Sequence, residues 1–397
     1  MSIKLSTKNL NIFFFDISQL GLLLSLCGAS LGIATINSLG VWMIFGAVVG
    51  VSVLGISKTK ENVFSLLLII AIIVIAFISM LYSDELSYKN IVNLLSFLEI
   101  PLFIVFTEPI DSNRRIKSAC FFAVLISVLY LYLFFSPRSH YYTTQYGVRI
   151  INDLTLGFSN PNETGIHLIS CLSLLCAAVF FVKKKFLRVI LLVDTVVISY
   201  FVVETLSRAS ILVGLLLIVM IIPVVRRKHV SKAFQQLCFL SPFFSFLIVL
   251  LFPNYLFSMQ LFGETVDTGR VSLLLSRFTS LNFIEWIVGD YSYTFENSLN
   301  AYLSIFLTVG LIALIAFLVI IKYGLKTCNL NATTSYNKIG FLAVLMFIVH
   351  ASVESANFVA GSFYAASFFG MYVIAIDNGR SDWLDNPKIN SKSISTR

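Results

Sequence analysis

Long apolar runs separated by short polar breaks extend over almost the whole chain. A helix needs about 20 mostly apolar residues to cross a bilayer, and the chain has about twelve runs of this kind. The pattern predicts an all-α polytopic membrane protein, with residues 1–397 forming a single integral membrane domain. We expect helices at 15–36, 39–57, 62–82, 90–106, 118–135, 164–182, 187–204, 209–225, 234–252, 299–322, 339–354 and 358–376.

Two polar stretches are much longer than the other breaks. They cover residues 136–163 and 253–298, and both are rich in aromatic residues and leucine. This composition is not typical of disordered segments, and long loops in a compact protein are usually functional. We therefore expect the active site in the larger loop, at 253–298, and a plain tail at 377–397.

The composition agrees with this class of protein. The chain is 58% hydrophobic and 12% charged, whereas a soluble domain has about 25% charged residues. The net charge of +8 is then mainly a topology signal and not the footprint of nucleic-acid binding. Five of the six cysteines fall in predicted spans and none in an outer loop, so no disulfide framework is expected. The first apolar run lacks a small-residue cleavage site, and we expect it to be a span rather than a removed signal peptide.

Lysine and arginine are distributed unevenly between the two predicted sides. If both termini are cytoplasmic, 22 of the 28 lie inside and six lie outside, as the positive-inside rule requires. Both long loops are then on the outer side. The six outer residues are Lys89, Arg138, Arg149, Arg208, Arg270 and Arg277.

The loop lengths restrict the function. The cytoplasmic loops are short and contain no glycine-rich motif that could bind a nucleotide phosphate. Any chemistry is therefore expected on the outer face, where nucleoside triphosphates and nucleotide sugars are absent. The donor must arrive already activated, and a lipid-linked pyrophosphate meets that condition.

Arginines on the outer side are not topology signals and are candidates for binding an anion. Arg208 lies in a very tight turn between two predicted spans. Arg270 and Arg277 are seven residues apart on a short interfacial helix expected to begin near Gly269, and so share one face. Leucines lie on that same face, which points the two charges toward an internal anion rather than toward water.

Two further groups lie at predicted helix starts. Asn162 could cap the span at 164–182, whose free N–H groups could hold an anion. Glu163 and His167, four residues apart, are expected to pair with each other. Glu296 begins the span at 299–322 with Asn297 and Asn300, and it would be a general base if desolvated, because burial raises the pKa of a carboxyl group.

Four ionisable residues fall within predicted spans, where they are costly to bury. His350 and Glu354 are four residues apart and could pair. A proton-coupled transporter would contain such residues, and this is the main observation in favour of a different class of function. The four are Glu99, Asp194, His350 and Glu354.

The outer segments resemble those of bacterial Wzy-type polysaccharide polymerases, which share a superfamily with O-antigen ligases. That family tends to have an N-P-N turn, an S-R pair between two spans, a G-R pair in a large periplasmic loop, and an H-N pair before a span with a glycine. The resemblance covers roughly residues 145–320. The matching positions are Asn160-Pro161-Asn162, Ser207-Arg208, Gly269-Arg270, and Glu296-Asn297 with Gly310.

The resemblance implies a metal-independent, C-type membrane glycosyltransferase without a cofactor, in the bacterial inner membrane. Arg208 and Arg270 would stabilise the leaving pyrophosphate of an undecaprenyl-linked glycan, since guanidinium groups match phosphate oxygens. The family histidine before Asn297 is Glu296 here, so either Glu296 is the base or the base lies elsewhere. The other implied substrate-binding residues are Arg149, Arg277, Asn162, Asn297 and Asn300.

The expected function is the joining of lipid-linked repeat units into O-antigen or capsule polysaccharide. The expected partners are the lipid-linked glycan, the bilayer and a chain-length regulator protein, and no nucleic acid. Three alternatives stay open, and a purely structural membrane protein is the least expected of them, given the outer arginines. An O-antigen ligase would use the same arginines with lipid A core as acceptor, and a lipid-linked oligosaccharide flippase would have a similar number of spans but no need of a long outer loop.

Overall fold

Apolar helices make up most of the computed structural model of this chain, and each of the twelve predicted ranges coincides with one of them. The structure describes residues 6–56, 63–136, 141–146, 149–158, 161–227, 229–252, 260–261, 264–265, 276–293, 300–354, 358 and 362–378. The twelve helices are α1 Thr7–Leu31, α2 Ala34–Ile56, α3 Val63–Tyr82, α4 Tyr88–Phe106, α5 Arg114–Phe135, α6 Pro161–Phe181, α7 Lys185–Glu204, α8 Arg208–Arg226, α9 Lys232–Leu251, α13 Ala301–Asn331, α14 Ser335–His350 and α16 Ser362–Ile376.

Nine helices in the described part of the chain are long and apolar enough to cross a membrane, and α14 and α16 are shorter apolar helices. This confirms a multi-pass helical membrane protein. The total number of helices that cross, and the side on which each terminus lies, stay predictions.

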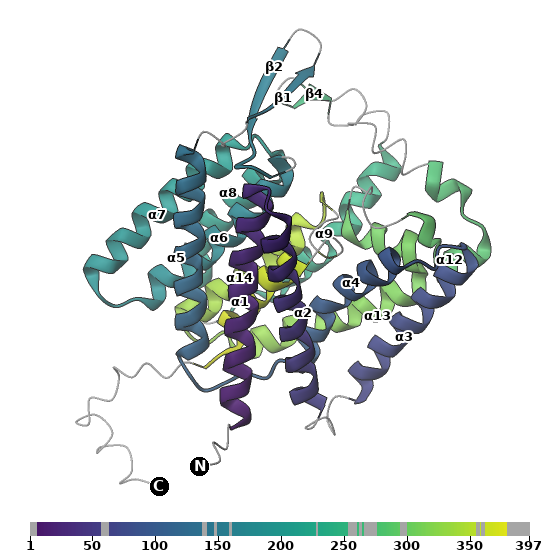
Figure 1. The fold of residues 1–397 in the computed structure, drawn as a ribbon, viewed down its shortest axis with the longest axis horizontal. Coiled ribbons are helices and arrows are strands. Elements are labelled where there is room, and N and C mark those ends of the chain that lie inside the picture. Colours follow the sequence, from purple (N-terminus) through teal and green to yellow (C-terminus); the bar gives the residue numbers. More distant parts are fainter. Residues whose placement is uncertain are drawn as a thin grey trace.

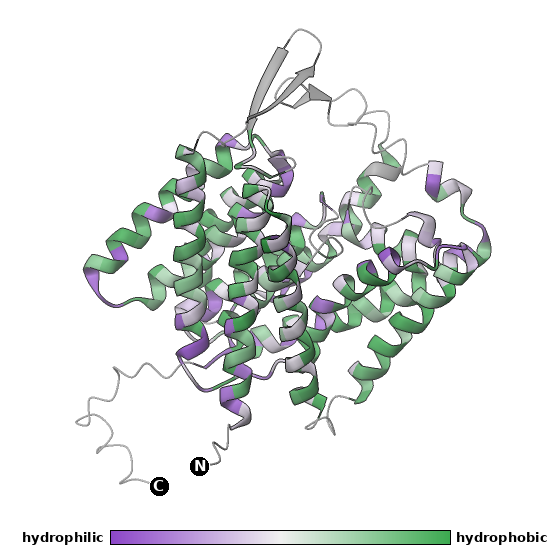
Figure 2. Ribbon diagram, viewed as in Figure 1, coloured by the Kyte–Doolittle hydropathy of each residue, from purple (hydrophilic) through white to green (hydrophobic). Residues whose placement is uncertain are grey.

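Hydrophobic residues predominate along the helices of the bundle (Figure 2), and many large apolar side chains are exposed as well as buried. Helix α6 lies at the centre of the bundle. Of its apolar 18-residue stretch, 89% of the residues are buried, whereas in the corresponding stretch of α7 only 22% are buried. Phe186, Val193 and Val196 on α7 are all more than half exposed. An apolar surface of this extent requires a non-aqueous environment, which the hydrocarbon of a bilayer provides.

One end of the bundle, which we call the basic end, is held together by lysine and arginine. Lys8 Nζ donates to the carbonyl of Asp111 at 2.9 Å, and Lys338 Nζ donates to that of Arg227 at 2.7 Å. These contacts bring the starts of α1 and α14 and the end of α8 to the same end. They agree with the predicted grouping of these residues on one side.

A buried ion pair joins the fifth helix to the last one at the basic end. Arg115 at the start of α5 pairs with Asp377, which directly follows α16, and both side chains are almost completely buried. Arg115 also donates to the carbonyl of Glu108, and the Ile110 N–H donates to Asp377 Oδ1 at 3.0 Å. Arg115 is therefore part of the core and not only a topology signal.

The opposite end, which we call the hairpin end, carries a β-hairpin that the sequence analysis did not predict (Figure 1). Strand β1 (Tyr141–Tyr146) pairs antiparallel with β2 (Arg149–Leu154) in the first long loop. Its base is anchored on the bundle, because Thr164 Oγ1 of α6 donates to the Thr155 carbonyl at 2.7 Å. A second, two-residue pair, β3 (Gln260–Leu261) and β4 (Glu264–Thr265), lies in the larger loop.

Part of the larger predicted loop packs against the bundle. Helix α12 (Phe283–Val288) lies beside α13 and α3, and the 3₁₀ turn Tyr291–Tyr293 follows it (Figure 1). Asn282 and Glu285 form a capping box at the start of α12. The Tyr291 hydroxyl is buried and donates to the Asn90 carbonyl at 3.1 Å, so this part of the loop is fixed to the start of α4.

Helix α13 is interrupted at Gly310, which has φ 75° and ψ 178°. The end of α12 packs directly against this break. A Cβ on Gly310 would lie 2.2 Å from the Ile287 carbonyl oxygen, and Gly289, at φ 80°, contacts Gly310 as well. Two donors satisfy carbonyls at the break: the Asp290 N–H bonds to Leu307 at 2.8 Å, and Ser79 Oγ bonds to Thr308 at 2.8 Å.

We expect single cysteines at the two ends to be labelled from opposite sides of the membrane. The test uses exposed positions, Ser292 near the hairpin end and Lys117 at the basic end, in a chain whose native cysteines are replaced by alanine. In intact spheroplasts, a membrane-impermeant thiol reagent should label Ser292→Cys, and it should label Lys117→Cys only after the membrane is disrupted. The reverse pattern would overturn the predicted orientation.

Candidate outer-end anion site

The starts of α6 and α8 approach each other closely at the hairpin end. Gly165, in the first turns of α6, makes this possible: a Cβ there would lie 2.2 Å from Ser210 Oγ and 2.7 Å from Ser210 Cβ. Each helix start carries the positive end of a helix dipole. Two such ends therefore lie side by side on the same edge of the bundle.

The turn that leads into α8 places Arg208 at this edge. Leu206 has a positive φ of 51°, which reverses the chain between α7 and α8 within a few residues. The Ser207 N–H bonds to Thr205 Oγ1 at 3.3 Å, and the Ser207 hydroxyl donates to Ser210 Oγ at 3.0 Å. The Ser207 hydroxyl is thus used by Ser210 and makes no capping hydrogen bond to the backbone of α8. Arg208, half-buried, is the first residue of α8.

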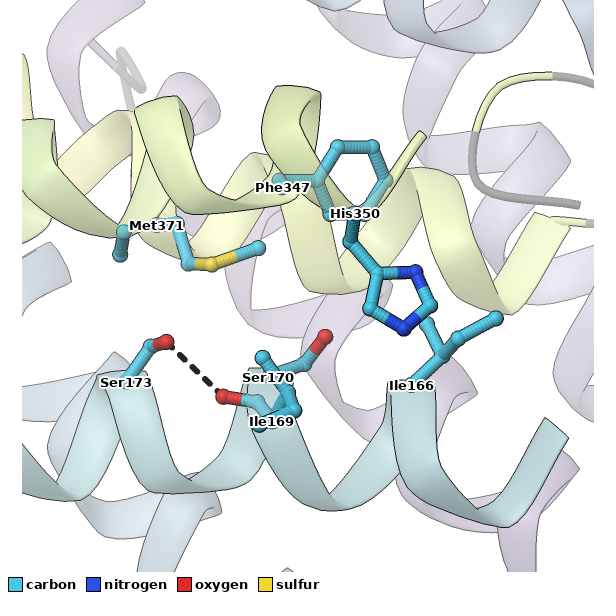
Figure 3. A pocket seen from close by; sticks show the side chains of 8 residues that line it. Ile166, Ile169, Ser170, Ser173, Phe347, His350 and Met371 are labelled. Atoms are coloured by element: carbon cyan, nitrogen blue, oxygen red, sulfur yellow. Dashed lines mark hydrogen bonds between the residues drawn. The ribbon is translucent and has the colours of Figure 1, made fainter. Parts of the chain in front are cut away.

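The end of α14 completes this region with a histidine. His350 Nε2 lies 3.1 Å from Ser210 Oγ, and the ring is buried. Figure 3 shows the His350 ring above Ile166 and beside Ser170 of α6. A cavity of about 10 Å³ there is lined by Ser170, Ser173 and His350 among others, and such a volume holds about one water.

The arrangement is suited to holding an anion at the membrane edge. A guanidinium group offers five donors in a fixed fork that matches phosphate oxygens, and the adjoining helix starts favour negative charge. His350, in contact with Ser210, lies in the same region. The region thus combines an arginine with a group able to accept a proton.

The predicted pairing of Glu163 with His167 is wrong. His167 is 2% exposed, and within the part of the chain that the structure describes neither ring nitrogen has a hydrogen-bond partner. The ring stacks on Tyr364 at 5.1 Å and contacts the rings of Phe158 and Phe363. Aromatic neighbours from the segment before α6 and from α16 enclose the imidazole and keep it in the core.

The predicted cap at Asn162 also needs correction. Helix α6 begins at Pro161, a position that proline favours because it lacks the N–H that would be unpaired there. Asn162 is therefore the second helical residue and not the cap. It is half-buried and stays at the predicted edge, close in sequence to Gly165.

Two predicted substrate-binding residues are engaged within the protein. Arg277 is exposed, lies 4.2 Å over the Tyr293 ring, and donates to the Tyr293 hydroxyl at 2.8 Å. Asn300 is 2% exposed and caps α13: its amide donates to the Pro242 carbonyl at 3.0 Å, and its oxygen accepts from the Leu303 N–H at 2.8 Å. Asn300 therefore has a structural role in joining α13 to α9.

The other predicted site residues are placed by the backbone or lie outside the described residues. Arg149 is the first residue of β2, opposite Tyr146 in the hairpin register. Glu296, Asn297, Arg270 and most of the interfacial helix expected to begin near Gly269 lie outside the described residues. Their roles stay predictions.

Two of the three carboxylates predicted within spans are each bound by a serine. Ser362 Oγ donates to Glu99 Oε1 at 2.8 Å, and Ser127 Oγ donates to Asp194 Oδ2 at 2.7 Å. Glu99 is 1% exposed. Ser127 and Asp194 join α5 to α7, and Glu99 and Ser362 join α4 to α16, so both contacts lie between helices that are distant in sequence.

The sequence analysis did not single out Gly165 or Ser210 as parts of a site, and it named Ser207 only as part of the Ser207-Arg208 motif. Small residues at helix starts have many uses, and the sequence gives no sign that these three face one another. The chain matches no protein-family model and no curated protein sequence. The resemblance to polysaccharide polymerases therefore depends only on the motifs quoted above.

Proposed function

We propose that this protein is a membrane glycosyltransferase that polymerises polyprenyl-pyrophosphate-linked repeat units at the hairpin end of the bundle. The observation that carries the proposal is the position of Arg208 in the first turn of α8, where the start of α6 packs against it through Gly165 and Ser210. An arginine in the first turn of one of two adjoining helix starts is suited to a pyrophosphate group.

In the proposed reaction, an acceptor sugar hydroxyl attacks the anomeric carbon of the donor. The new bond joins the acceptor oxygen to that carbon, and the bond from the carbon to the pyrophosphate oxygen breaks on the opposite side, with inversion. The hydroxyl proton passes to a base, for which Glu296 is the first candidate. The charge that develops on the leaving pyrophosphate is stabilised by Arg208 and Arg270, and this is expected to be the larger contribution to rate.

His350 is a second candidate for the base. It is located at the same end as Arg208 and contacts Ser210. Imidazole is the side chain most often used for proton transfer near neutral pH. If Glu296→Gln, which keeps the side-chain size but cannot accept a proton, retains near-normal activity, Glu296 leaves the mechanism and His350 is tested next.

An O-antigen ligase would use the same arginines, so the anion site alone does not separate the two enzymes. A proton-coupled flippase or transporter is the second candidate, and one observation favours it: Glu99 and Asp194 are bound by serines between helices that are far apart in sequence. Ionisable residues in such positions are typical of ion pathways.

The glycan phenotype of a deletion strain separates these classes. Loss of a polymerase leaves a single repeat unit on its final carrier, because export and ligation still work. Loss of a ligase leaves polymer on the polyprenyl lipid, and loss of a flippase leaves repeat units on the cytoplasmic side with no surface glycan. We expect the single-unit band in gel profiles of extracted glycolipid, restored to a ladder by the wild-type chain.

A further inference from the structure

We propose that the seam between α9 and α13 at the basic end is a binding site for an anionic phospholipid. The seam contains a cavity of about 440 Å³, within the range of small-molecule sites. It lies on the opposite side of the bundle from the proposed active site and does not depend on that proposal.

Three lysines from two helices surround the cavity. Lys232 begins α9, and Lys322 and Lys326 are four residues apart on α13, so the latter two share one helix face. All three side chains are exposed. None of the described residues that line the cavity is acidic, so no lining carboxylate competes with an anionic ligand for these ammonium groups.

Neutral polar groups add donors beside the lysines. Gln235, Gln236, Tyr323 and Asn329 also line the cavity. Gln235 Nε2 donates to Asn329 Oδ1 at 2.9 Å and to the Val230 carbonyl at 2.8 Å. This contact joins the start of α9 to the end of α13 and fixes one wall of the cavity.

An apolar path continues from this basic cavity along the same two helices. Phe239 lines the basic cavity, and Pro242 and Phe243, one helical turn further along α9, line a second cavity of about 180 Å³. The second cavity is lined almost wholly by aromatic and aliphatic side chains, including Phe246, Trp286 and Leu314. From Lys326 to Leu311 the distance along α13 is about 22 Å at 1.5 Å per residue, which exceeds half of a ~30 Å hydrocarbon core.

This order of groups matches the chemistry of a phospholipid. The phosphate would lie among the three lysines at the membrane surface, and an acyl chain would follow the apolar side chains toward the middle of the bilayer. Basic pockets between transmembrane helices bind anionic head groups on the positively charged side of a membrane protein. A free phosphate would use the lysines but would gain nothing from the apolar path.

The test uses the full chain purified in zwitterionic detergent. The probes are phosphatidylglycerol, phosphatidylethanolamine and inorganic phosphate, added in separate titrations followed by the apparent melting temperature. We expect phosphatidylglycerol to raise the melting temperature of the wild type and the other two probes to raise it little. Lys232→Gln/Lys322→Gln/Lys326→Gln should weaken the apparent affinity for phosphatidylglycerol on the order of 100-fold, because each lysine near an anionic lipid contributes several-fold.

Three control variants make the result specific. Lys117→Gln/Lys184→Gln/Lys185→Gln removes the same charge from exposed lysines that do not line the cavity, and it should bind phosphatidylglycerol like the wild type. The triple Lys→Arg variant at the cavity should retain binding. Lys326→Gln alone should show an intermediate loss and provides a readout if the triple variant is poorly folded.

Three outcomes would overturn the proposal. Equal responses to phosphatidylglycerol and phosphatidylethanolamine would exclude a site selective for anionic lipid. Equal losses in the two glutamine triple variants would indicate general surface charge. A full response to inorganic phosphate would assign the lysines to a free anion rather than to a lipid.

Discussion

Arg208→Ala is expected to reduce glycan polymerisation by about 100-fold or more, the loss typical when a group that stabilises developing charge is removed. Arg208 is the first residue of α8, beside the packed starts of α6 and α8, and alanine leaves only the helix dipoles and the predicted contribution of Arg270 to stabilise the leaving pyrophosphate. Arg208→Lys keeps the charge but loses the two-pronged contact, so it should retain a small part of the activity. The measurement is the glycolipid ladder of a complemented deletion strain.

Arg226→Ala is the matched control for this prediction. Arg226 ends the same helix at the basic end and is exposed, so its loss should leave the ladder at full length. A full-length ladder in Arg208→Ala, at normal protein level, would refute the role of Arg208. A profile without even the single-unit band, with the core intact, would favour the ligase or the flippase.

Arg115→Ala is expected to destabilise the protein by roughly 3–5 kcal/mol, because it leaves a buried carboxylate without its partner. Arg115 and Asp377 are 1% and 0% exposed, so water cannot compensate the remaining charge. The apparent melting temperature of the purified protein, and its level in the membrane, should both fall.

The double variant Arg115→Met/Asp377→Leu tests the cause of this loss. Replacing a buried pair by apolar groups of similar volume is often neutral or stabilising, so the double variant should recover most of the stability. Arg114→Ala, at the exposed neighbouring position, should change stability little. A double variant as unstable as Arg115→Ala would show that the pair itself, and not the unpaired charge, determines the stability.

The helices were predictable because their signal is local. Each apolar run is long enough to identify a helix in a bilayer. What the runs did not predict is the residue at which some helices begin or end. Helix α1, for example, begins at Thr7 and not at 15, since Ser6 accepts a bond from the Asn9 N–H at 3.3 Å and caps the helix earlier. The extension of α13 to Asn331 was missed because its last turns contain polar residues that face the basic end.

Features that depend on distant parts of the chain were not predictable from local patterns. The break in α13 needs Gly310 and Gly289 in contact, although the sequence shows only two glycines 21 residues apart. The His350–Ser210 contact joins residues that are 140 positions apart. Helical spacing suggested that Glu163 would pair with His167, but the aromatic rings that enclose His167 come from other elements.

Arg208 lies where the sequence analysis expected it, in a tight turn between two apolar helices. Its role in binding an anion stays a prediction. The structure adds its neighbours, Gly165 and Ser210, which no spacing in the sequence connects. Arg277 had a similar signal, yet its contact is with Tyr293 on its own loop.

The Arg115–Asp377 pair has a consequence for the assembly of the chain. Because ribosomal synthesis proceeds from the N-terminus, α5 enters the membrane with its arginine before the last helix exists. Arg115 therefore stays without its carboxylate partner until about 260 further residues have been made. In a chain that stops before residue 377, the Arg115 guanidinium group has no carboxylate partner, so its charge stays unneutralised. The pair thus makes the final packing of α5 depend on the arrival of α16.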